Sequence, residues 1–165
     1  MADGDGVPKP GGSGFDRTMV VVSDRQQDLT VDEDRWAGLM RRVLAEEGVA
    51  IPWEVGLSFV GADQMARLNA EHRGINRPTD VLAFGVDDGR SPRADDEPRL
   101  VGDVVVCPSV AASNAADRGK SVEDELALLV VHGALHLLGY DHIDDVDALA
   151  MEVRERELLA RAGSR

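Results

Sequence analysis

Three of the four histidines in the chain lie within eleven residues, HGALHLLGYDH, at His132, His136 and His142. A neutral imidazole offers a nitrogen lone pair, and this borderline-soft ligand suits zinc. Three protein ligands with a fourth position left for water form the usual catalytic arrangement, whereas structural zinc sites use four ligands and are mostly rich in cysteine. Because the chain has one cysteine, the cluster predicts an open, catalytic zinc site, although another divalent ion can also occupy three histidines.

The spacing of these histidines fits a helix followed by a tight corner. Residues 121–138 form an apolar helical run that begins with a serine cap, so His132 and His136 lie about 40° round and about 6 Å along from each other on one face. Gly139 can adopt the left-handed conformation that ends a helix, and the chain can then bring His142 back to the same ion. The alternative, in which two of these histidines only pack in a core, suits a lone histidine better.

The pattern H-x-x-x-H-x-x-G-x-x-H has the skeleton of the metzincin protease motif, with one difference. The residue after the first histidine is Gly133, where those proteases have the glutamate that acts as general base. A peptidase mechanism of that type therefore lacks its proton acceptor.

The remaining sequence predicts one α+β domain, with about five helices packed on a small mixed sheet of four strands. Strands are expected at 17–23, 53–60, 81–86 and 100–107, and helices at 28–48, 62–72, 109–117, 121–138 and 145–162. The metal site is expected at the end of the central helix. Residues 1–14, rich in Gly and Pro, predict a disordered leader before a domain that spans 15–165.

Several details of these elements can also be predicted. Thr30 and Glu33 predict a capping box at the start of the first helix. Trp36 in that helix and Trp53 in the second strand occupy apolar periodic positions, so both are expected in the core. The fourth strand is mostly apolar, which predicts burial on both of its faces.

The composition limits the possible partners and compartment. The chain has 31 acidic and 18 basic residues in 165, a net charge of −13, which argues against broad binding to a nucleic-acid backbone. The single Cys107 excludes an internal disulfide and fits a reducing cytoplasm. Neither a signal peptide nor an apolar run long enough to span a membrane is evident, so a cytoplasmic protein with no membrane partner is expected.

Three stretches together resemble one known family. HGALHLLGYDH resembles the signature of the YbeY family, the bacterial metal-dependent endoribonucleases of ribosomal RNA maturation. LNAEHRGINRPTDVLAFG resembles that family's L-N-x-x-x-R-x-x-x-x-P-T-D-V-L-S-F segment, with Ala83 where serine is usual, and GDVVVCP resembles its Gly-Asp strand. The resemblance covers residues 68–142; the leader and the acidic loop at 87–99 match nothing in it.

The resemblance implies a cytoplasmic hydrolase that cuts single-stranded RNA, with roles in maturation of the 3′ end of 16S ribosomal RNA and in ribosome quality control. It implies one zinc ion on His132, His136 and His142, whose bound water attacks the phosphodiester. It also implies a functional arginine, which falls on Arg73. A guanidinium is well shaped to stabilise the charge that develops on phosphate oxygens.

Two acidic residues are further candidates near the site. Asp141, beside a proposed ligand, can accept a proton, orient an imidazole or bond the turn, and we favour a role behind the ligands or in the turn. Glu125 lies seven residues before His132 and shares its helix face, so it can hold a ligand's far nitrogen or an arginine, or simply favour the helix dipole. The general base is left open.

The negative charge shapes the functional hypothesis. A local groove with Arg73 and Arg77 can hold a few nucleotides, with the acids of 87–97 on a separate loop, while the ribosome or a basic ribosomal protein provides the targeting. Two alternatives are a non-catalytic ribosome assembly factor with a metal-stabilised docking site and, less favoured, a metallohydrolase of another substrate.

Overall fold

A computed structural model of the chain describes residues 17–89 and 97–163. The predicted leader and most of the acidic loop lie outside the described residues. The described elements, in chain order, are β1 (Thr18–Asp24), α1 (Glu33–Glu46), β2 (Trp53–Phe59), α2 (Ala62–Arg73), β3 (Val81–Gly85), β4 (Arg99–Val106), α3 (Pro108–Arg118), α4 (Val122–Leu137) and α5 (Asp145–Gly163). None of the described helices is long and apolar enough to cross a membrane.

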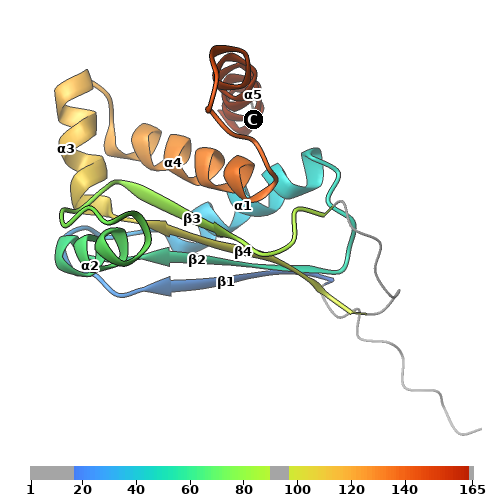
Figure 1. Cartoon of the computed structure of the whole chain (residues 1–165), viewed down its shortest axis with the longest axis horizontal. Helices are drawn as coiled ribbons and strands as arrows, with labels where there is room; N and C mark the ends of the chain where they lie inside the picture. The colour runs from blue at the N-terminus through green and yellow to red at the C-terminus, as the bar shows by residue number, and fades with distance from the viewer. Residues whose placement is uncertain (1–16, 90–96, 164–165) are drawn as a thin grey trace, which may run out of the picture.

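The four strands form one mixed sheet in the order β1-β2-β4-β3. The β1–β2 and β2–β4 pairs are parallel, whereas β3 runs antiparallel to β4 at the sheet edge. Helices α1 and α4 pack against one face, and α5 lies beyond α4 on the side away from the sheet (Figure 1). The predicted α+β class and mixed four-stranded sheet are confirmed.

Most of the core lies between the sheet and the α1–α4 layer. Trp36 of α1 and Trp53 of β2 are each 2% exposed, which confirms both as core residues. A smaller cluster on the opposite face packs Met65 of α2 against Leu82 and Val105. Helix α4 contacts the sheet and helices α1, α3 and α5, so it is the central helix and gives the residues at its end a rigid base.

Two sequence predictions about these elements are wrong. Helix α1 begins at Glu33, and its cap is Asp32, whose side chain accepts the N–H of Arg35. Glu33 is therefore the first helical residue and cannot close a capping box with Thr30.

The fourth strand is not buried on both faces throughout. Val104, Val105 and Val106 are buried, but Leu100 is 51% exposed. On the second face, helix α2 covers only the carboxyl end of β4, where Val105 lies, so the start of the strand has no covering layer there.

Candidate metal centre

Helix α4 positions the first two histidines, and the corner after it positions the third. Ser121 caps the helix by accepting the N–H of Asp124, as the sequence predicts. The last turn closes when the N–H of Gly139 donates to the carbonyl of His136 at 3.1 Å. Gly139 has a φ of 94°, the left-handed conformation that glycine adopts without a Cβ clash, and the chain turns back toward the helix there.

The three imidazoles converge at this corner. One nitrogen from each of His132, His136 and His142 lies within 4.8 Å of the other two. The Nε2 atoms of His132 and His136 are 3.0 Å apart, and the ring centroid of His142 is 5.1 Å from that of His136. The first two rings are half-buried and the third is exposed, so the cluster is open on the side of His142.

Two of these rings, His132 and His136, have surroundings that suit binding to a cation. Nδ1 of His132 lies 2.5 Å from Oε1 of Glu155, and because a carboxylate accepts, Nδ1 carries the hydrogen and Nε2 presents its lone pair. Burial, followed by the charges of His132 and His142, lowers the pKa of His136. A neutral imidazole is the form that binds a metal ion, so the donor set fits zinc on three nitrogens.

The carboxylate that orients a histidine is Glu155 of α5, a residue that the sequence analysis missed. Glu125 is 0% exposed and pairs instead with Arg118, at 3.2 Å. Three roles were considered for Glu125 from the sequence, and the structure shows the one in which it pairs with an arginine. The sequence does contain a feature that could have indicated Glu155. It lies on the same side of α5 as Met151 and Leu158, which are buried, and a glutamate is unusual at a position where an apolar residue is expected.

The other predicted site residues lie around the corner and beyond it. Oδ1 of Asp141 accepts the backbone N–H of His142 at 2.7 Å, which is the bond within the turn. Arg73 is exposed at the end of α2 and, within the described residues, makes no hydrogen bond or ion pair. The preceding His72 packs its ring on Phe84 of β3, with centroids 4.4 Å apart.

A hollow of about 520 Å³ adjoins His136. Asp87 and Asp88 line it together with His136 and Gly139. The prediction that the acids of 87–97 lie on a separate loop is therefore wrong for the first two of them. The reason is the direction of β3, which runs antiparallel to β4 and so delivers the chain after Gly85 beside the end of α4.

Comparisons with known proteins agree with this arrangement. Residues 21–163 match the family described as Endoribonuclease YbeY. The chain belongs to this family. An endoribonuclease YbeY from Salinispora tropica is 44% identical over 149 residues, covering 86% of this chain and 95% of the relative. Another from Desulforamulus reducens is 38% identical over 148 residues, covering 87% and 97%.

A solved structure is also similar. The solution structure of TM1509 from Thermotoga maritima superposes with a TM-score of 0.60 at 26% identity, covering 87% of this chain and 89% of that one. Membership of the YbeY family makes the chain a nuclease that hydrolyses RNA.

Packing explains why this YbeY protein has glycine, with no side chain, directly after its first histidine. A Cβ built on Gly133 would lie 2.5 Å from Cγ1 of Val104 in β4, so α4 approaches the sheet too closely for any larger residue. The position of the metzincin glutamate thus faces the core instead of the site.

Gly133→Ala is expected to destabilise the fold. Overpacking costs about 1–3 kcal/mol, which outweighs the gain of about 1 kcal/mol in helix propensity. Urea unfolding measures the difference. The matched control is Gly38→Ala in α1, where a Cβ meets nothing within 4 Å and the substitution is expected to stabilise. Equal gains in stability from both variants would contradict the close packing.

Proposed function

We propose that this YbeY protein is a cytoplasmic, single-strand-specific endoribonuclease that uses zinc. We further propose that it acts in maturation of the 3′ end of 16S ribosomal RNA and in ribosome quality control. The observation that carries the proposal is the convergence of three imidazole nitrogens within 4.8 Å on a corner that is open at His142. Family membership supports RNA as the substrate.

The residues that would hold the ion are His132, His136 and His142. A bound zinc ion supplies Lewis-acid chemistry and lowers the pKa of a coordinated water toward neutrality. The protein prepares two of these rings: burial lowers the pKa of His136, and Glu155 holds the hydrogen of His132 on Nδ1. Asp141 holds the backbone of the turn, and we assign it no proton transfer.

Arg73 is proposed to bind the phosphate that is cleaved. Its guanidinium is exposed and makes no competing ion pair with a described residue, so it is available to a phosphate oxygen. The side chain is long, and the His72 ring before it packs on Phe84, one residue from Gly85 at the edge of the hollow. This supports a position for Arg73 at the border of the site.

Arg73→Ala is expected to lower RNA cleavage by about 100-fold, because one positioned donor to the developing charge is lost. Zinc content is expected to stay at the level of the unmodified protein, since the arginine is no ligand. Cleavage of a single-stranded RNA under single-turnover conditions measures the effect. Arg67→Ala, an exposed arginine on the same helix but a different face, is the control and should cleave normally. Equal rates for both variants would exclude this role.

The charge of the chain supports targeting by a partner. A net charge of −13, with Asp87 and Asp88 beside His136, opposes tight binding of free RNA. We therefore propose that the ribosome or a basic ribosomal protein delivers the substrate.

The direct test of the proposed function is cleavage of single-stranded and double-stranded RNA of one sequence by the zinc-loaded protein. Preferential cutting of the single strand, lost on chelation and restored by zinc, is expected. Zinc binding without any RNA cleavage would instead indicate an assembly factor.

A further inference from the structure

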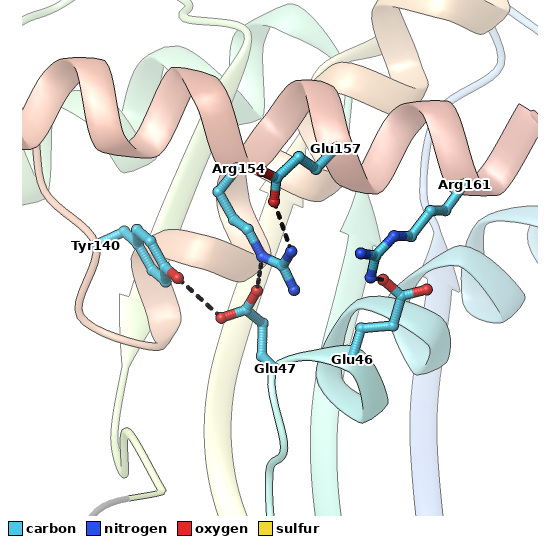
Figure 2. A network of polar contacts seen from close by, with 6 residues as sticks. All are labelled: Glu46, Glu47, Tyr140, Arg154, Glu157 and Arg161. Atoms are coloured by element: carbon cyan, nitrogen blue, oxygen red, sulfur yellow. Dashed lines mark hydrogen bonds and ion pairs between the residues drawn. The ribbon is translucent and has the colours of Figure 1, made fainter.

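The segment that carries the third histidine is attached to a distant helix. Tyr140, two residues before His142, is half-buried against the main core cluster. Its hydroxyl donates to Oε2 of Glu47 at 3.0 Å (Figure 2). Glu47 is the residue that ends α1, so this bond joins the corner of the metal centre to an element 93 residues earlier in the chain.

The second oxygen of the same carboxylate is attached to α5. Oε1 of Glu47 accepts from Nε of Arg154 at 2.5 Å, and the side chains of the two residues are only 11% and 20% exposed. Figure 2 shows the Glu47 carboxylate between Tyr140 and Arg154, with Glu157 holding the other side of the guanidinium at 2.8 Å. At this degree of burial, solvent screens the charges weakly, and the charge-assisted bond is directional.

The bonds from Glu47 to Tyr140 and to Arg154 each end within two residues of a residue that belongs to, or contacts, the histidine cluster. Tyr140 fixes the backbone two residues from His142. Arg154 fixes the turn of α5 that carries Glu155, whose carboxylate contacts Nδ1 of His132. One side chain on α1 thus restrains both the exposed imidazole and the carboxylate that orients a half-buried one.

We propose that Glu47 is a positioning residue for the metal centre. It touches none of the three imidazoles; it acts through Tyr140 and Arg154, and so sets how closely His142 and the Glu155-bound His132 approach each other. This inference rests on the proposed function, because it takes the three histidines to be the zinc ligands.

The neighbouring residue provides a matched control. Glu46 is also a glutamate at the end of α1 and also pairs with an arginine of α5, Arg161, at 2.9 Å. That pair lies further along α5 than Arg154, on the side away from Tyr140 (Figure 2). A general role in attaching α5 to α1 predicts similar effects at the two positions, whereas a positioning role predicts an effect at Glu47 alone.

The experiment measures zinc affinity of the full chain by competition with a chromophoric chelator, with no RNA present. Glu47→Gln keeps the size of the side chain but removes its charge, and it is expected to weaken zinc binding by about 10-fold, the lower end of what outer partners of metal ligands contribute. Glu46→Gln is expected to stay within about 2-fold of the unmodified protein. Tyr140→Phe, which keeps the ring and removes only the hydroxyl, is expected to weaken zinc binding in the same direction.

The outcomes separate this inference from the proposed function. If Glu47→Gln and Tyr140→Phe both bind zinc as the unmodified protein does, or if Glu46→Gln loses as much affinity as Glu47→Gln, the positioning role is wrong, while zinc binding by the histidines stands. If Glu47→Gln does not fold, the Tyr140→Phe result decides. If the unmodified protein binds no zinc that depends on His132, the proposed function itself fails.

Discussion

His136→Ala is expected to abolish zinc binding and RNA cleavage together. His136 lies between the other two rings, with its Nε2 3.0 Å from that of His132, and its lowered pKa keeps it in the form that a metal ion needs. Residues that merely support a ligand contribute about 10–100-fold to affinity or activity, so the loss of a ligand should exceed 100-fold. Zinc analysis of the purified variant and an RNA cleavage assay measure the two effects.

The control for this prediction is His72→Ala. His72 is the one histidine of the four that lies outside the cluster; it is exposed and its ring contacts Phe84. Its replacement should leave the zinc content unchanged. Circular dichroism of His136→Ala should match that of the unmodified protein, because His136 is only half-buried at the end of α4. A folded His136→Ala variant that still cleaves RNA at the normal rate would contradict a catalytic role for the cluster.

Glu155→Ala is expected to weaken zinc binding by about 10–100-fold. The glutamate holds the hydrogen of His132 on Nδ1 and so directs the lone pair of Nε2 toward the other imidazoles. Without the carboxylate the ring can rotate and exchange tautomers. Ordering the ring when zinc binds then costs free energy, which weakens the affinity. Chelator competition gives the affinity, and nitrogen chemical shifts of the histidine rings report the tautomer.

Glu152→Ala is the matched control for Glu155. It removes a glutamate one turn earlier on α5 that is 56% exposed and pairs with Arg156. That variant should bind zinc normally and keep the tautomer of His132. If Glu155→Ala changed neither the affinity nor the tautomer, the carboxylate would have only a structural role in α5.

Local patterns in the sequence account for the elements and for the core of the site. The periods of apolar residues predicted each helix and strand to within a few residues, apart from the start of α1, because side-chain burial repeats with the geometry of the backbone. His132 and His136 were expected on one face because both lie on one helix, and the turn at Gly139 was expected because only glycine adopts its φ of 94° without strain.

What the sequence did not reveal depends on contacts between distant segments. No spacing rule connects Glu155 or Glu47 to the histidines, since each comes from a separate helix and meets the corner only after packing. The approach of Asp87 to His136 likewise follows from the antiparallel direction of β3, which the order of strands along the chain does not specify. The helix cap is Asp32 and not the predicted Thr30, because the backbone enters the helix two residues after Thr30.

The measurement that tests the central claim most directly is a crystal structure of the zinc-loaded protein, with the ion located by its anomalous scattering. We predict a single zinc at the end of α4, with one nitrogen each of His132, His136 and His142 at about 2.0–2.1 Å. Zinc bound elsewhere on the chain, or held at this corner by fewer than three of these imidazoles, would contradict it.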